Sequence, residues 1–256
     1  MTINRDDLSA RVPFTIKTAI LVDGGYYRKR AFHWCGKKSP QERAEELERY
    51  CHCHIGKDKY LYRIFYYDCP PLDKIVFHPL TGKQVDFKKE ATYKWSFDFL
   101  NELKKKRKFA LRLGKLEERG GTFRIKQQSL KKIMSKALTI EGLTESDFEI
   151  DFGQKGVDMR IGLDIASLAH KKQVDQIVLI AGDSDFVPAA KHARREGIDF
   201  ILDPMGQKVN DDLFEHIDGM RSYWKSICVQ RKPTSTAETA TIDVSTCDTH
   251  GKRLLE

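Results

Sequence analysis

With 256 residues, the chain is long enough for one large α/β domain with its own buried core. No apolar run is long enough to span a bilayer, and the N-terminus lacks the charged-then-apolar layout of a signal peptide. Six scattered cysteines do not form a disulfide framework, so we expect a protein of the reducing cytoplasm without membrane contact. The net charge of +8 favours a polyanionic partner.

The first predicted strand is the apolar run at 18–22, which follows a lead-in of little structure at 1–15. This strand ends in Asp23-Gly24-Gly25. Paired glycines directly after a strand indicate a turn into a helix where the backbone closely approaches another group. The G-x-G-x-x-G spacing is incomplete, which disfavours a dinucleotide site.

Helical and strand patterns then alternate as far as a basic region. The predicted helices are 26–34, 41–50 and 97–108, and the predicted strands are 60–67 and 109–116. Residues 71–96 are polar and punctuated by Pro and Gly, with hairpin character near their centre. We interpret them as an insertion or a flap in the domain.

The stretch from 155 to 186 is the most informative part of the sequence. Its second half contains the β-branched apolar run at 177–181, which is typical of a strand buried on both faces of a parallel sheet. The residues Gly182-Asp183-Ser184-Asp185 follow at the carboxyl end of this strand. Open α/β sheets place their ligands at such ends.

The first half of the same stretch, 157–172, has helical spacing and leads into the strand. This helix must run antiparallel to the strand, so its first turn delivers Asp158 to the same edge as Asp183 and Asp185. Asp164 lies about 9 Å farther along the helix axis. We therefore interpret Asp164 as structural, with a secondary acid of the site as its alternative.

The remaining elements are a helix at 188–196 capped by Gly197, a strand at 198–202, and a final helix at 210–224. Residues 227–256 are rich in Thr and Ser without periodicity, which predicts a disordered tail. The alternation of strands and helices predicts a doubly wound, mainly parallel sheet in one domain at 17–226.

Carboxylates from three separate segments are expected at one rim of this sheet. They are Asp23, Asp158, Asp183 and Asp185. Four converging carboxylates repel one another unless a cation neutralises them, and hard oxygen ligands suit Mg²⁺ or Mn²⁺. The bland alternative, that Asp183 and Asp185 only cap the next helix, explains one acid of the four.

Three short segments resemble the NYN-domain proteins, in particular the bacterial LabA-like branch, whose fold is similar to that of PIN-domain nucleases. The segments are 19–24 (AILVDG), 155–158 (KGVD) and 182–186 (GDSDF). The resemblance extends over about 17–224 and implies a metal-dependent nuclease that acts on RNA, with the four aspartates as its acidic cluster. The family commonly carries an Asn shortly after the first Asp-Gly, where this chain has Gly25, Tyr26 and Tyr27.

A basic surface for nucleic acid is expected between 100 and 136, where 13 Lys or Arg stand against three Glu. Lys155, just before Asp158, is the cation best placed to contact a bound phosphate, and the backbone from Ser184 onward offers amides at a helix start. The remaining candidate contacts are Lys104, Lys105, Lys106, Arg107, Arg124 and Lys126. A solvated face is the alternative for these cations.

Two other functions compete with a ribonuclease that leaves 5′-phosphate ends. The altered first motif favours a catalytically silent module that binds RNA, a nucleotide or a protein partner. The D-x-D of Asp183 and Asp185 also allows a phosphoaspartate phosphatase, although such enzymes usually carry that motif after the first strand. The run Cys51-His52-Cys53-His54 suggests zinc, but its spacing favours reduced thiols.

Overall fold

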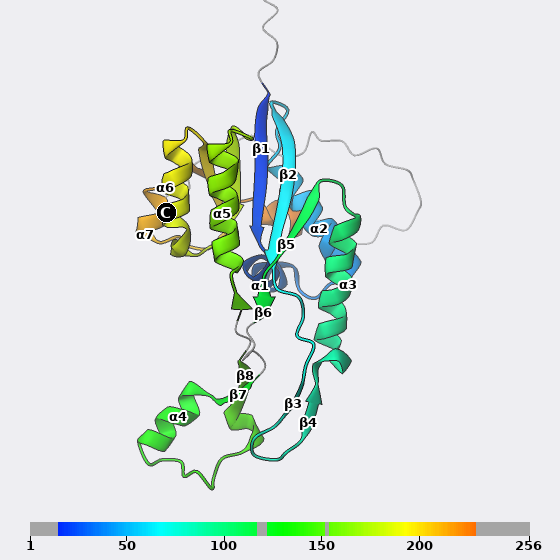
Figure 1. Ribbon diagram of the computed structural model, residues 1–256, viewed down its shortest axis with the longest axis vertical. Coiled ribbons are helices and arrows are strands. Elements are labelled where there is room, and N and C mark those ends of the chain that lie inside the picture. Colours follow the sequence, from blue (N-terminus) through cyan, green and yellow to red (C-terminus); the bar gives the residue numbers. More distant parts are fainter. Residues whose placement is uncertain (1–14, 117–121, 152–153, 229–256) are drawn as a thin grey trace, which may run out of the picture.

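The computed structural model describes residues 15–116, 122–151 and 154–228. Its central sheet has six parallel strands: β1 (Ile16–Asp23), β2 (Lys59–Asp68), β5 (Phe109–Leu113), β10 (Gln176–Ile180), β11 (Asp199–Asp203) and β12 (Gly219–Met220). They are arranged in the order β12-β11-β10-β1-β2-β5 (Figure 1). The order reverses between β1 and β10, so the sheet is doubly wound and the predicted fold class is confirmed.

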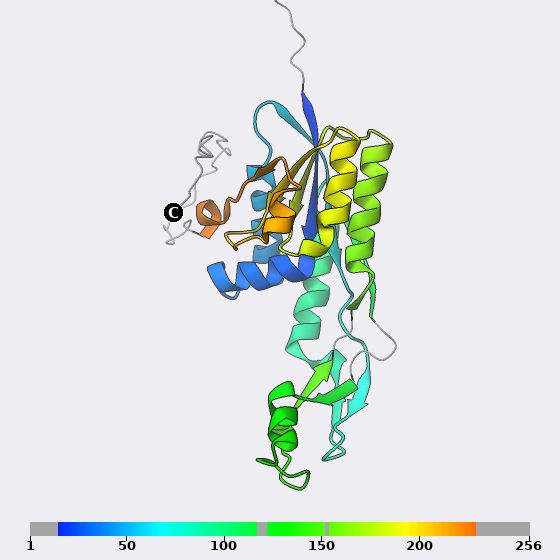
Figure 2. The same cartoon turned by 90° about the vertical axis from the view of Figure 1, so that its left-hand side faces the viewer.

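Helices cover both faces of the sheet (Figure 2). One face carries α1 (Gly24–Cys35), α2 (Pro40–Cys53), α3 (Ala91–Lys105) and α8 (Trp224–Cys228), and the other carries α5 (Val157–His170), α6 (Val187–Arg195) and α7 (Asp211–Phe214). Successive residues of β1 alternate between these layers, because Ala19 and Leu21 pack under α5 and α6 whereas Ile20 and Val22 pack under α1 and α2. Burial on both faces explains why the central strands are apolar without polar alternation.

The start of α2 shows how local sequence sets an element boundary. The Ser39 side chain accepts from the backbone N–H of Glu42, and the Glu42 carboxylate accepts from the backbone N–H of Ser39. Pro40 occupies the first helical turn, where no hydrogen bond from its nitrogen is needed. This capping box fixes the start of α2, and the apolar residues of α2 and α3 pack together on the sheet.

A second structural unit, which we call the arm, projects past the edge where β1 and β2 end (Figures 1 and 2). Its first part is the hairpin of β3 (Ile75–Phe77) and β4 (Gln84–Asp86), followed by the turn η2 (Phe87–Lys89). Its second part comprises β7 (Thr122–Ile125), α4 (Gln127–Met134), η3 (Glu145–Asp147) and β8 (Phe148–Asp151). The short antiparallel pair of β6 (Lys115–Leu116) and β9 (Gln154–Lys155) connects the second part to the domain.

His78 joins the two parts of the arm. Its ring packs against Phe123 at 4.6 Å and Phe148 at 4.9 Å between ring centroids, while its Nδ1 accepts from the backbone N–H of Leu80. The insertion expected at 71–96 therefore packs against a segment that the sequence analysis treated only as basic. The domain limits of 17–226 stay a prediction.

The predicted helix at 210–224 is wrong. The structure instead has one helical turn at α7, the edge strand β12 and a separate start of α8. Asp218 explains the interruption, because its carboxylate accepts from the backbone N–H of Phe200 and binds Arg194, which draws the chain alongside β11. The lead-in at 1–14 and the tail from 229 onward lie outside the described residues.

Most of the other predicted core elements are confirmed within three residues at their ends. The exceptions are α3, which begins at 91 inside the predicted insertion and not at 97, and the strand predicted at 109–116, which divides into β5 and β6. Gly197 follows α6 with a positive φ of 84°, as expected of a glycine after a helix end. Among the residues described, no helix is both long and apolar enough to cross a membrane.

Candidate metal centre

The carboxyl ends of β1 and β10 meet at the point where the strand order reverses. Val22 pairs with Ile180 in the register of the two strands, so Asp23 and the Gly182–Asp185 segment leave the sheet side by side. Such a reversal point is where doubly wound sheets bind ligands. We refer to Asp23, Asp158, Asp183 and Asp185 as the acidic rim.

Asp23 is the last residue of β1 and the N-cap of α1. Its Oδ1 accepts from the backbone N–H of Tyr26 at 3.1 Å. Burial raises the pKa of this carboxyl to about 6, and the neighbouring charges of Asp158 and Asp68 raise it further against the effect of the backbone hydrogen bonds. Asp23 is therefore an acid that the fold holds in an unfavourable environment.

The other three acids interact with one another at the start of α5 and η4 (Ser184–Phe186). Burial raises the pKa of Asp158, and the charges of Asp183 and Asp185 raise it as well. Asp183 caps η4 by accepting from the backbone N–H of Asp185 at 3.1 Å. Capping thus accounts for Asp183 but not for Asp158 or Asp185, neither of which forms an ion pair within the described ranges.

Two glycines allow the rim to close tightly. A Cβ on Gly24 would lie 2.5 Å from the ring of Tyr66 and 2.6 Å from the carbonyl of Tyr67. A Cβ on Gly182 would lie 2.4 Å from the ring of Tyr26, whose hydroxyl donates to the carbonyl of Pro204 at 2.6 Å. The close approach predicted at Gly24-Gly25 is therefore made between the Gly24 backbone and β2. The Tyr26 ring packs on Gly182 and fixes the turn after β10.

Asp68 is a rim neighbour that the sequence analysis did not select. It ends β2 as Asp23 ends β1, and its charge raises the pKa of Asp23. Burial raises the pKa of Asp68 itself, although Arg28 at 3.0 Å opposes this, as do the hydroxyl of Tyr66 and the backbone N–H of Cys69. The signal that identifies it is the repeated pattern of an acid at the end of a parallel strand.

Asp164 lies outside the acidic rim. Its Oδ2 accepts from the hydroxyl of Tyr67 at 2.8 Å and from Nε of Arg112 at 3.0 Å, which ties α5 to β2 and β5. These two partners support the structural interpretation of this residue.

The donor chemistry of the rim suits Mg²⁺ or Mn²⁺, because these ions bind carboxylate oxygens. Their binding is most favourable where it also relieves repulsion between carboxylates. Within the described part of the chain, no three His, Cys, Asp or Glu side chains stand close enough to hold an ion between them. The rim therefore fits an ion held by one or two carboxylates and completed by water and substrate phosphate. A preformed cage of protein ligands does not fit it.

The basic run at the end of α3 is remote from the rim. Phe109 starts β5 immediately after this run, so Lys104, Lys105, Lys106 and Arg107 lie at the amino edge of the sheet, opposite the acids. Two of them already have anionic partners, since Lys105 binds Glu102 and Lys106 binds Glu48 at 2.7 Å. The structure does not bring these four cations to the acidic rim.

The remaining predicted contacts are divided between the arm and the rim. Arg124 pairs with Glu149 at 2.9 Å and Lys126 donates to the carbonyl of Ser146 at 2.6 Å, so both serve the arm. Lys155 belongs to β9 directly before α5, and Ser184 begins η4 between two rim acids. Only the last two belong to segments that adjoin the rim.

The Cys51–His54 run does not form a metal site with other described residues. Cys51 is buried on the inner face of α2, and His54 turns inward so that its Nε2 lies 2.9 Å from Oδ2 of Asp203. These two residues therefore belong to the core, whereas His52 is exposed.

Comparison with known protein families agrees with this description. The family model described as the NYN domain matches residues 98–218, which confirms the resemblance expected from sequence. The matched span includes Asp158, Asp183 and Asp185, whereas β1 with Asp23 lies before it. No curated protein sequence matches the chain.

Solved structures give weaker likenesses. A protein of unknown function from Vibrio parahaemolyticus shares 13% identity, with 82% of this chain and 93% of that chain covered and a TM-score of 0.43. A maltogenic alpha-amylase from Thermotoga neapolitana shares 10% identity, with 82% and 49% covered and a TM-score of 0.21. TM-scores this low establish neither a shared fold nor a shared function.

Proposed function

We propose that this chain, which matches the NYN-domain family model at residues 98–218, is a metal-dependent ribonuclease, because members of that family are generally RNase-like nucleases. It hydrolyses phosphodiester bonds so that the bond between phosphorus and the 3′ oxygen breaks. The water oxygen joins the phosphorus and a proton passes to the 3′ oxygen. The products carry a 5′-phosphate and a 3′-hydroxyl.

The observation that carries the proposal is the convergence of carboxylates at the reversal point of the sheet. Asp23 comes from β1, Asp158 from the first turn of α5, and Asp183 and Asp185 from the turn after β10. Their mutual repulsion raises the pKa values of Asp23 and Asp158, on top of the effect of burial. Acids held together at such an energetic cost are typical of functional sites.

Asp23, Asp158, Asp183 and Asp185 are the residues that would hold Mg²⁺ or Mn²⁺, with one or two of their carboxylates on any one ion and the rest of its coordination supplied by water and substrate phosphate. A bound ion of this kind polarises a phosphate and lowers the pKa of a bound water. Asp23 and Asp183 each use an oxygen to cap the following helical segment, which fixes the orientation of their carboxylates. Because the pKa of Asp23 is about 6 in the metal-free protein, metal affinity should fall as the pH drops below that value.

Cleavage of a labelled single-stranded RNA in Mn²⁺ tests this proposal. Asp23→Asn and Asp185→Asn should each slow cleavage about a hundredfold or more, which is on the order of 3 kcal/mol in the barrier. The double variant should be scarcely slower than either single variant, because residues that act as a unit are not additive. Analysis of the product ends should show 5′-phosphates.

The matched control is Asp58→Asn, an exposed acid at the amino edge before β2, which should cleave like the wild type. Equal cleavage by Asp23→Asn, Asp185→Asn and the wild type would refute the assignment of the site.

A silent nucleic-acid-binding module is the second candidate. It is favoured by the absence of a three-ligand cage among the described residues and by Tyr26, which packs the turn where the family commonly has an Asn. Binding of RNA or DNA by the wild type without any metal-dependent cleavage would establish this candidate in place of the enzyme.

A further inference from the structure

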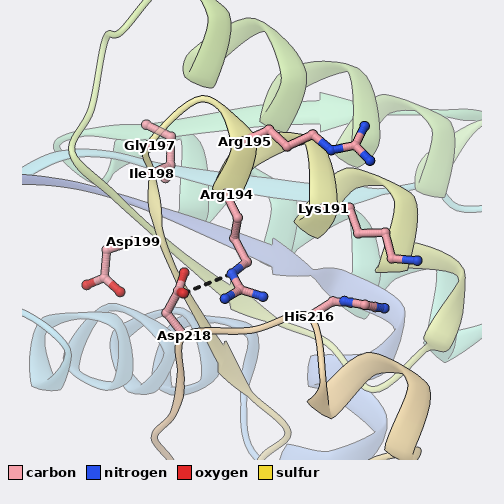
Figure 3. A pocket seen from close by; sticks show the side chains of 8 residues that line it. All are labelled: Lys191, Arg194, Arg195, Gly197, Ile198, Asp199, His216 and Asp218. Atoms are coloured by element: carbon pink, nitrogen blue, oxygen red, sulfur yellow. Dashed lines mark hydrogen bonds and ion pairs between the residues drawn. The ribbon is translucent and has the colours of Figure 1, made fainter.

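A hollow of about 770 Å³ lies beside α6, away from the acidic rim (Figure 3). Its wall is formed on one side by α6 and on the other by the segment that leads from α7 into β12. We call it the α6 groove and define it by Lys191, Arg194, Arg195, Asp199, His216 and Asp218. Most of the residues that line it are charged, and Gly197 and Ile198 complete the lining.

Three cations of the α6 groove belong to the helix itself. Lys191 precedes Arg194 by three residues and Arg195 by four, so it is a neighbour of both on the helix surface, whereas the adjacent Arg194 and Arg195 diverge (Figure 3). Figure 3 shows His216 extending from the opposite wall beneath Lys191. Cations at a helix C-terminus commonly interact only with the helix dipole. This does not explain Lys191, which lies a full turn before the end of α6, or His216, which lies on another segment.

The groove contains both fixed and unpaired cations. Arg194 is fixed, because its Nε donates to Oδ1 of Asp218 at 2.9 Å and its Nη1 to the carbonyl of Glu215 at 3.3 Å. The two carboxylates are also committed, Asp218 to the backbone N–H of Phe200 and Asp199 to the Gln176 amide. Lys191 and Arg195 have neither an ion pair nor a side-chain hydrogen bond within the described residues.

The groove is directly connected to the rim by the chain itself. Asp185 lies in η4, which continues into α6, and α7 packs against η4. Along α6, Lys191 lies about 9 Å and Arg195 about 15 Å from Asp185, at 1.5 Å per residue. At about 3.4 Å per nucleotide these distances correspond to roughly three nucleotides for Lys191 and roughly four for Arg195.

We propose that the α6 groove binds the backbone phosphates of the nucleic-acid strand at positions flanking the bond held at the acidic rim. This inference rests on the proposed function. Unpaired Lys and Arg side chains in a hollow lined mostly by charged residues match an extended polyanion better than a small apolar ligand, since small-molecule pockets are mostly apolar. Two phosphate contacts are assigned, one to Lys191 and one to Arg195.

Binding of a fluorescent 20-nucleotide RNA in EDTA tests the groove without cleavage. The Lys191→Gln/Arg195→Gln double variant should lower the log–log slope of affinity against salt by about 1.4, at about 0.7 per single-strand phosphate contact. Its binding of a dinucleotide should not differ from that of the wild type, because two nucleotides span only about 7 Å at about 3.4 Å each, which is less than the distance of about 9 Å from Asp185 to Lys191. The control is Arg49→Gln/Lys57→Gln, which removes the same charges from exposed positions on and after α2 and should leave the slope unchanged.

An unchanged slope for the groove variant would overturn the inference. Protection of the wild type, but not of the groove variant, by ATP in a thermal melt, with RNA binding unaffected, would also overturn it and identify a free nucleotide as the ligand. A lowered slope together with no cleavage of any RNA by the wild type would refute the ribonuclease and support the groove. Normal binding by the groove variant together with normal cleavage by the wild type would refute only the groove.

Discussion

Asp23 and Asp203 have the same position in the fold but different surroundings. Each is the last residue of a parallel strand of the central sheet. Asp203 is fully buried and accepts hydrogen bonds from the hydroxyl of Tyr50 at 2.5 Å, the backbone N–H of Met205 at 2.8 Å, and the hydroxyl of Ser222, with Nε2 of His54 at 2.9 Å. Asp23 accepts backbone hydrogen bonds and lies near the charges of Asp158 and Asp68, and the one cation whose pKa it raises, Arg28, forms its ion pair with Asp68.

The difference separates an acid that stabilises the fold from acids whose mutual repulsion a bound cation would relieve. A buried carboxylate surrounded by donors is part of the core, because each donor is satisfied by it. A carboxylate beside like charges costs stability until a cation arrives. Asp68 is intermediate, since burial raises its pKa while Arg28 offsets part of that effect.

The largest expected effect is the loss of stability in Asp203→Ala. This change leaves the Tyr50 hydroxyl and the His54 ring buried without their acceptor, so we expect the free energy of unfolding to fall by about 3–5 kcal/mol. Urea unfolding followed by circular dichroism measures it. Asp203→Asn keeps the shape of the side chain and should cost less. A loss below about 1 kcal/mol in Asp203→Ala would contradict the structural role of this acid.

In contrast to Asp203→Ala, Asp23→Asn should raise the free energy of unfolding. The pKa of Asp23 is raised from 3.8 to about 6, so the folded state holds the proton more tightly and the stability of the wild type falls as the pH rises between those values. At about 1.36 kcal/mol per pKa unit the upper limit is about 3 kcal/mol, and we expect about 1–2 kcal/mol because the side chain is only half-buried. Asn retains the cap on α1.

The measurement is urea unfolding at pH 4 and pH 7.5 in EDTA. The variant should be more stable than the wild type at pH 7.5, and the two should converge at the lower pH, where Asp23 is protonated when folded. Asp58→Asn serves as the exposed control and should show no such difference between the two pH values. A variant that is less stable than the wild type at pH 7.5 would show that Asp23 is not under electrostatic strain.

The core of the fold was predictable because the amino-acid composition of its central strands identifies them. The runs at 18–22 and 177–181 are buried on both faces, so their composition alone identifies them as central parallel strands. The β3–β4 hairpin of the arm was predicted near the centre of 71–96 and is confirmed, whereas β7 and β8 were not predicted, since they are short and pair across a gap in the sequence. The two-residue strand β12 was missed for the same reason, because its position depends on the contacts of Asp218.

The candidate site was predictable to the extent that it follows from strand ends. An acid after a buried strand must lie at the carboxyl edge, so Asp23, Asp183 and Asp185 were assigned together from sequence. Whether such an acid has partners depends on residues that are distant in sequence, and for that reason Asp68 with Arg28 could not be evaluated. The position of the cations was still harder to predict. A basic run in the sequence indicates positive charge but not the edge of the sheet at which the fold places that charge.

The smallest expected effect concerns the basic run at the end of α3. Replacing Lys104, Lys105, Lys106 and Arg107 together with Gln should lower the log–log salt slope of RNA binding by no more than about 0.7, which is one phosphate contact. Lys105 and Lys106 already pair with Glu102 and Glu48, and the whole run lies at the amino edge on the face opposite α6. Fluorescence anisotropy across a salt series, with the α6 groove variant measured in parallel, provides the comparison. A slope that falls by about 2.8, as four contacts would require, would place the nucleic acid on the α3 face and leave the α6 groove without a role.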